Sequence, residues 1–105
     1  LLKVQGHRVS PDEVALAVAG MPGVGEVAVF GVDGGAVGHR IVLCCSGDPE
    51  REELRGSIQR RCRARLPSYM QPAIVVVLAE LPHNPNGKVD EAALRLRVRA
   101  CTDAT

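Results

Sequence analysis

Lys88 is the residue of this sequence whose possible chemistry is most clearly defined. It follows Asn86-Gly87 in a segment dense in helix breakers, between an apolar run and a helix start. A lysine on such a tight loop is presented to solvent by a scaffold that cannot easily retract it. Its ammonium is a compact charge with three donors, suited to a phosphate or to a carboxylate on which negative charge accumulates.

Spacing alone favours a simpler interpretation of the same residues. Asn86-Gly87 is then an ordinary turn and Lys88 a solubilising surface residue, as most exposed lysines are. A nucleotide P-loop is excluded, because Pro82 stands where that motif needs glycine and Val89 where it needs a hydroxyl.

The cysteines do not predict a metal site. They include no C-x-x-C pair, and the adjacent two should point to opposite faces of a strand. We expect no metal ligation and interpret Cys44, Cys45 and Cys62 as small buried apolar residues in a reducing compartment. The cysteines of the chain are Cys44, Cys45, Cys62 and Cys101.

The first half of the chain predicts a short strand at Lys3 to Gln5, then a short helix followed by two paired strands. Pro11 begins the helix, with Ser10 as N-cap and Glu13 completing a capping box. The paired strands are β-branched runs at 26–30 and 41–45.

The second half predicts helix, strand, loop and helix. A helix opening at 48–50 has an inward stripe of Leu54, Ile58 and Cys62. The cations Arg60 to Arg65 at its end indicate a solvated terminus or a surface for an acidic partner. The run 74–78 should be a buried, central strand, and Asp90 should cap the last helix.

Overall composition limits the kinds of partner. The 105 residues carry a net charge of +1 and only two aromatic side chains. We therefore do not expect nucleic-acid binding through the overall electrostatic field or through base stacking. No apolar run is long enough to span a membrane, and no export signal is recognised at the start. We expect a single α+β domain over residues 1–99 with a frayed polar tail at 100–105, in the cytoplasm.

Two segments of the chain contain motifs. One includes Leu66-Pro67-Ser68-Tyr69-Met70-Gln71-Pro72 and Leu81-Pro82-His83-Asn84-Pro85-Asn86-Gly87-Lys88-Val89-Asp90. The other reads Lys3-Val4-Gln5-Gly6-His7-Arg8-Val9-Ser10-Pro11-Asp12-Glu13-Val14. The first resembles the last core motif, and the second the post-hinge motif, of the AMP-forming adenylating enzymes, a superfamily of acyl-CoA synthetases, luciferases and nonribosomal peptide synthetase adenylation domains.

The resemblance covers only the small C-terminal lid subdomain of those enzymes. It implies a small antiparallel three-stranded sheet flanked by helices. It also implies a large N-terminal adenylation domain as partner, in cis or in trans, which would hold the carboxylic acid and most of the contacts to ATP and Mg²⁺. The lid alone should not catalyse a reaction.

The resemblance assigns roles to residues in two half-reactions. Lys88, supported by Asn86 and Gly87, would offset negative charge as the acyl-adenylate forms. The subdomain would then rotate and bring the loop of Gly6, Arg8 and Glu13 to the channel for a phosphopantetheine thiol of CoA or of an acyl or peptidyl carrier protein. Gly6 would let the backbone pass close to a ligand, and Arg8 would orient the loop by pairing with a carboxylate.

Two other interpretations remain open at this point. In some acyl-CoA synthetases the matching lysine is acetylated, so Lys88 could also be a control point. The element order also fits a ferredoxin-like regulatory or interaction module without catalysis. Sheet topology separates the two folds, because the ferredoxin-like one places the first strand in the middle of the sheet.

Overall fold

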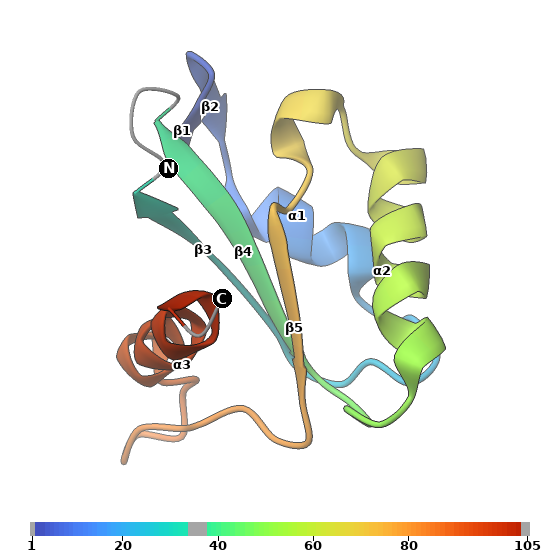
Figure 1. Ribbon diagram of the computed structural model, residues 1–105, viewed down its shortest axis with the longest axis vertical. Coiled ribbons are helices and arrows are strands. Elements are labelled where there is room, and N and C mark those ends of the chain that lie inside the picture. Colours follow the sequence, from blue (N-terminus) through green and yellow to red (C-terminus); the bar gives the residue numbers. More distant parts are fainter. Residues whose placement is uncertain (1, 34–37, 104–105) are drawn as a thin grey trace.

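The computed structural model describes residues 2–33 and 38–103 and has three layers (Figure 1). A three-stranded sheet lies in the middle, with α1 and α2 on one face and α3 on the other, and a separate β1–β2 hairpin lies at one end. The elements are β1 Leu2–Val4, β2 His7–Val9, α1 Pro11–Val18, β3 Val27–Asp33, β4 His39–Ser46, α2 Glu52–Arg65, the 3-10 turn η2 Ser68–Met70, β5 Ile74–Leu78 and α3 Glu91–Asp103.

This topology confirms the α+β class and excludes the ferredoxin-like alternative. The first strand forms a two-stranded sheet with β2 and makes an isolated bridge from Val4 to Gly38, just before β4, whereas the larger sheet has the order β3-β4-β5. Among the described residues, no helix combines the length and apolarity needed to cross a bilayer.

The prediction of an antiparallel sheet is wrong for one of its two strand pairs. β3 pairs with β4 antiparallel, but β4 pairs with β5 parallel. The reason is the connection: α2 carries the chain back along the sheet, and such a crossover returns the next strand in the same direction.

The prediction that 74–78 is the central strand is also wrong, because β4 is central and β5 lies at an edge. The segment is apolar because helices cover both faces of β5. Burial of a strand's faces does not determine which of its edges pair with other strands. The free edge is partly blocked by Arg55, whose Nε donates to the carbonyl of Val75 at 3.1 Å.

Local signals at the helix starts were only partly correct. Ser10 is the N-cap of α1, but its side chain makes no capping hydrogen bond, since the N–H of Glu13 already bonds to the Ser10 carbonyl at 3.1 Å. α2 begins at Glu52, later than predicted, because Asp48 Oδ1 accepts the N–H of Glu50 in a preceding turn. α3 continues to Asp103, past the start of the expected tail; residues 104–105 lie outside the described residues.

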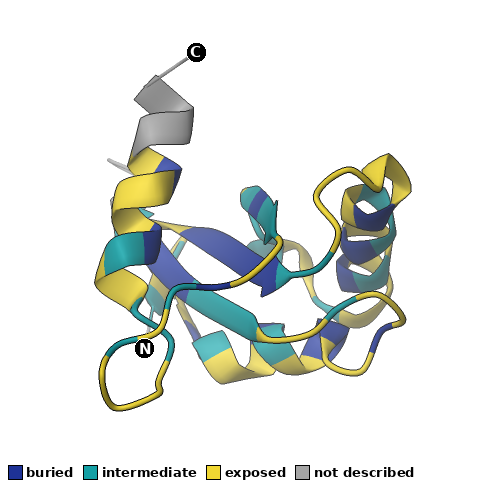
Figure 2. Cartoon of the chain, turned by 90° about the horizontal axis from the view of Figure 1, so that it is seen from below, coloured by how far each residue is buried: buried dark blue, intermediate teal, exposed yellow. Residues whose placement is uncertain are grey.

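Successive side chains of β4 point to opposite faces of the sheet and so divide the core in two. Ile41, Leu43 and Cys45 face α1 and α2, whereas Val42 and Cys44 face α3. Figure 2 shows the buried residues following the strands and the inner sides of the helices. The adjacent cysteines therefore lie on opposite faces, as the sequence predicts.

Burial of the thiols predicts that the protein loses stability in alkali. Desolvation, and secondarily the neighbouring Cys45, raises the pKa of Cys44 from 9.0 to about 11. Above pH 9 the unfolded chain releases this proton first, so stability is complete below pH 9 and falls as the pH approaches 11. We expect a loss of about 1 kcal/mol in the free energy of unfolding at pH 10 from this thiol, measured by urea unfolding. Cys44→Ala should show a shallower pH dependence; identical slopes would contradict this assignment.

Candidate active-site loops

The loop that carries Lys88 is a closed hairpin between β5 and α3. Its arms meet at a bridge between His83 and Val89. Beyond the bridge, the N–H of Asn84 donates to the Lys88 carbonyl at 2.8 Å, and the N–H of Gly87 donates to the Asn84 carbonyl at 2.9 Å. The lysine therefore stands on an internally bonded turn.

Both ends of this hairpin are fastened to the domain. The N–H of Asp90 donates to the Pro82 carbonyl at 2.8 Å, and Asp90 Oδ1 caps α3 by accepting the N–H of Ala93 at 3.1 Å. His83 Nε2 contacts Glu26 Oε1, on the segment before β3, at 2.8 Å. Val89 packs against the buried cluster that includes Leu94 of α3.

Lys88 itself is exposed, and its ammonium has no ion pair or hydrogen bond with any residue in the described ranges. An exposed ammonium on an internally bonded turn can meet an anion on another surface without first breaking a contact within the described chain. Such availability is a precondition of the catalytic role that the sequence predicts.

Gly87 gives this loop its backbone course. Its φ is +82°, a left-handed conformation, while the space beside its Cα is open. Alanine there meets no neighbour but strains the backbone, so Gly87→Ala should lower the free energy of unfolding by about 1–2 kcal/mol. Gly56→Ala, inside α2 with no close contact, should raise it by about 0.5–1 kcal/mol. Denaturant unfolding measures both changes; a neutral Gly87→Ala would show that the turn does not need this conformation.

The second predicted loop is the two-residue turn of the β1–β2 hairpin. Gln5 and Gly6 both have positive φ, +51° and +83°, and Val4 pairs with His7 across them. This is the type I′ turn that suits a tight hairpin. Gly6 is thus required by the turn itself, and its Cα side is open to solvent.

The motif at 66–72 supports this hairpin. The ring of Tyr69 stacks on that of His7 with centroids 4.0 Å apart. Gln71 Nε2 donates to the carbonyls of Cys62 and Leu66, at 2.9 Å each, and so closes the end of α2. These residues position the hairpin through packing and helix capping.

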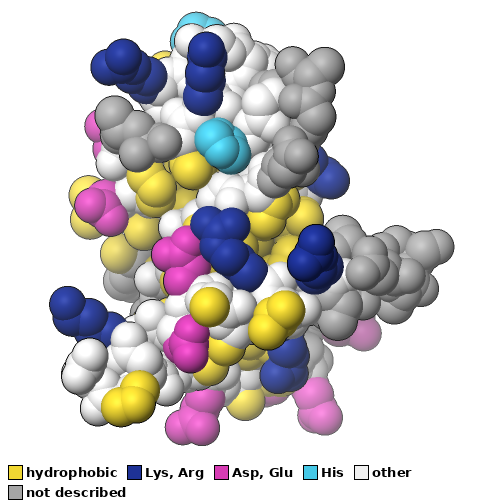
Figure 3. Space-filling view, turned by 90° about the vertical axis from the view of Figure 1, so that its left-hand side faces the viewer, with side chains coloured by type: hydrophobic (Ala, Val, Ile, Leu, Met, Phe, Trp, Pro, Cys, Tyr) yellow, Lys and Arg dark blue, Asp and Glu magenta, His cyan; other side chains and the backbone are white. Residues whose placement is uncertain are grey.

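Arg8 and Glu13 are both exposed, and neither side chain bonds to another described residue. The carboxylate partner expected for Arg8 is therefore not found within the described chain. Lys3 lies directly opposite Arg8 in the hairpin, and two facing cations repel each other. The upper end of the face in Figure 3, which holds this hairpin, carries Lys, Arg and His side chains, while Asp and Glu side chains lie mostly in its middle and lower parts.

The two loops lie at opposite ends of the molecule. In Figure 1 the β1–β2 hairpin is at the upper end, and the loop between β5 and α3 is at the lower end. One fixed orientation of this domain cannot bring both loops to the same small site.

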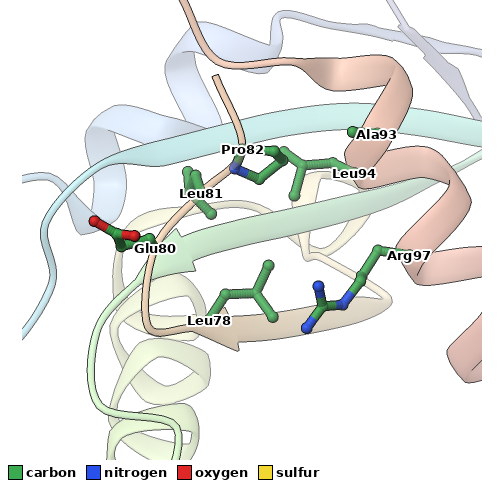
Figure 4. Close-up of a pocket in the computed structure, with 7 residues that line it drawn as sticks. All are labelled: Leu78, Glu80, Leu81, Pro82, Ala93, Leu94 and Arg97. Atoms are coloured by element: carbon green, nitrogen blue, oxygen red, sulfur yellow. The ribbon is translucent and has the colours of Figure 1, made fainter. Parts of the chain in front are cut away.

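Lys88 does not line either of two cavities found in the described part of the chain. One of about 260 Å³ lies between the end of β5, the chain that follows it, and α3 (Figure 4). It is lined by Leu78, Glu80, Leu81, Pro82, Ala93, Leu94 and Arg97. The second lies beside α1. The described residues also contain no group of three side chains able to hold a metal ion.

The fold is a small α+β domain that carries an exposed lysine on a loop at one end. Comparison with known proteins shows the family to which it belongs. Residues 13–88 match the family described as the AMP-binding enzyme C-terminal domain. The chain belongs to this family, which confirms the resemblance identified in the sequence.

Relatives include both carrier-protein ligases and acyl-CoA synthetases. L-proline--[L-prolyl-carrier protein] ligase from Streptomyces coelicolor is 38% identical over 99 residues, covering 91% of this chain and 18% of that protein. Isonitrile lipopeptide synthase from Mycobacterium tuberculosis is 33% identical over 93 residues, covering 89% and 4%. A fatty acyl CoA synthetase structure from the same organism superposes with a TM-score of 0.80 at 32% identity, covering 93% and 19%. The chain thus spans about a fifth or less of these proteins.

Asn84 is the site residue that sequence reasoning missed. Its Oδ1 accepts the N–H groups of Asn86 and Lys88, at 3.0 and 3.1 Å. The Asn86 side chain, which was expected to support the lysine, makes no such bond within the described chain. An asparagine directly before Pro85 is a recognised turn-forming signal that could have identified it.

Proposed function

We propose that this chain is the lid of an AMP-forming carboxylic acid ligase and that Lys88 serves its adenylation half-reaction. The observation that carries this proposal is the exposed ammonium on an internally bonded hairpin, which has no partner among the described residues and lies outside both of the cavities described above. Such a lysine acts on a substrate that another domain holds. That partner is the large N-terminal adenylation domain, in cis or in trans.

In the first half-reaction, a carboxylate oxygen of the acid attacks the α-phosphorus of ATP. The bond to pyrophosphate breaks, and the acyl-adenylate and pyrophosphate form. Negative charge accumulates between the carboxylate and the phosphate, and Lys88 lies there as a compact cation. We assign ATP and its Mg²⁺ mainly to the large domain, since this chain supplies the lysine alone.

In the second half-reaction, a phosphopantetheine thiolate attacks the acyl carbon and AMP leaves. We propose that the domain has by then rotated, so that Gly6, Arg8 and Glu13 lie at the thiol channel. The placement of the two loops at opposite ends supports a rotation, because withdrawing one loop is required to admit the other. The exposed cations of the hairpin suit an acceptor that carries phosphate.

The acceptor is either CoA or a carrier protein, and relatives of both kinds occur. One relative's name specifies a prolyl-carrier protein and one solved structure is a fatty acyl CoA synthetase.

The three described cysteines are free and buried, which supports a reducing, cytoplasmic location.

Reconstitution tests this function. The chain alone, with ATP and a panel of carboxylic acids, should not exchange labelled pyrophosphate into ATP. The same chain joined to a large adenylation domain should support exchange with that domain's acid. Robust exchange by the isolated chain would contradict the assignment.

A further inference from the structure

We propose that Asn84 is the positioning residue of the Lys88 loop, fixing where the ammonium is delivered. The proposal rests on the function proposed above and adds a residue to it. Asn84 touches no reacting atom; it acts through Lys88.

The hydrogen bonds of the loop converge on this one residue. Pro85 has no N–H to donate, and the next three N–H groups all end on Asn84. Those of Asn86 and Lys88 bond to its Oδ1 at 3.0 and 3.1 Å, and that of Gly87 bonds to its carbonyl at 2.9 Å. Its own N–H returns to the Lys88 carbonyl at 2.8 Å. Lys88 is thus held by both of its backbone polar groups.

No other side chain among the described residues bonds to the backbone of 85–88. The loop tip is exposed, so packing does not fix its course either. Without the side-chain amide of Asn84, the N–H groups of Asn86 and Lys88 would donate to water instead, and the loop would sample other conformations. A long side chain magnifies such changes at its base, and a misplacement of about 1 Å can cost about 10²-fold in rate.

A side chain that only stabilised the fold would behave differently. It would affect both half-reactions together, through the amount of folded protein. A positioning residue should lower the turnover number of adenylation while the thioester step, which uses the opposite end of the domain, continues.

The experiment compares variants in the intact ligase that contains this chain. Asn84→Ala should lower the kcat of pyrophosphate exchange by about 10- to 10²-fold, with little change in the rate of thioester formation from supplied acyl-adenylate. Asn84→Ser, whose hydroxyl can accept similar bonds, should recover much of the loss. Asn86→Ala removes the same kind of amide from the same loop and should cost much less. Amide hydrogen exchange at Lys88 should accelerate in Asn84→Ala and less in Asn84→Ser.

The possible results separate this proposal from the one it rests on. If Lys88→Ala is inactive in adenylation but Asn84→Ala is fully active, the positioning role is wrong and the proposed function stands. If Lys88→Ala is itself active, the proposed function fails, and the role of Asn84 fails with it. If Asn84→Ala and Asn84→Ser lose both half-reactions equally, Asn84 is structural, which overturns the proposal.

Discussion

Replacing Lys88 with alanine in the intact ligase is expected to lower the rate of adenylate formation by about 10²- to 10³-fold. In the proposed function, the lysine supplies a positive charge where negative charge accumulates, and no other lysine or arginine occurs within the loop from 83 to 90. Thioester formation from chemically supplied acyl-adenylate should be largely retained, because the proposed function assigns that step to the other end of the domain. Pyrophosphate exchange and single-turnover thiolation measure the two rates separately.

Two further variants serve as controls for Lys88→Ala. Lys88→Arg keeps the charge but replaces a compact ammonium with a planar, longer group, so it should recover only part of the rate. Arg63→Ala removes an exposed cation from the end of α2, far from the loop, and should leave pyrophosphate exchange unchanged. Equal loss of both half-reactions in Lys88→Ala would indicate a structural residue.

Gly6→Asn is expected to produce the opposite pattern. Asparagine tolerates the positive φ of +83°, so the type I′ turn should survive while a side chain is added at its tip. If this tip lines the thiol channel, thiolation should fall by about 10²-fold while pyrophosphate exchange is retained. Quenched-flow measurement of thioester formation gives this rate.

Gly20→Asn provides a matched control for the backbone change. Gly20 has nearly the same φ, +80°, and the same open space beside its Cα, but it lies in the connection after α1. It should leave both half-reactions intact. A thiolation rate in Gly6→Asn equal to that in Gly20→Asn would remove Gly6 from the proposed channel.

The sequence predicted the elements well where side-chain pattern and local breakers agree. The stripe of Leu54, Ile58 and Cys62 is buried as expected, and Asp90 caps α3. The opposite placement of Cys44 and Cys45 also followed directly from the two-residue period of a strand.

Pairing between strands was less predictable. An apolar run such as Ile74–Leu78 reports that both faces are covered, but the edge position of β5 and its parallel pairing depend on where α2 returns the chain. The short β2 was missed because His7–Val9 has no apolar alternation to indicate it, and its partner strand is equally short.

The candidate site also has features that the sequence could predict and features that it could not. Lys88 and Gly87 could be found from their types and spacing, together with the resemblance. The central role of Asn84 in the loop and the absence of a described partner for Arg8 depend on atomic contacts that residue types do not specify. Gly6 was predicted to let the backbone pass close to a ligand, whereas the positive φ that the structure shows comes from the hairpin, which includes the unpredicted strand β2.

The central claim is that the Lys88 ammonium reaches the reacting groups in one orientation of the domain and leaves them in another. A crystal structure of the intact ligase with ATP and its acid, trapped before reaction, tests this directly. We predict Nζ at about 2.7–3.1 Å from oxygens of both the carboxylate and the α-phosphate, with the β1–β2 hairpin turned away. If the hairpin occupied the cleft there and Lys88 remained in solvent, the account would be contradicted.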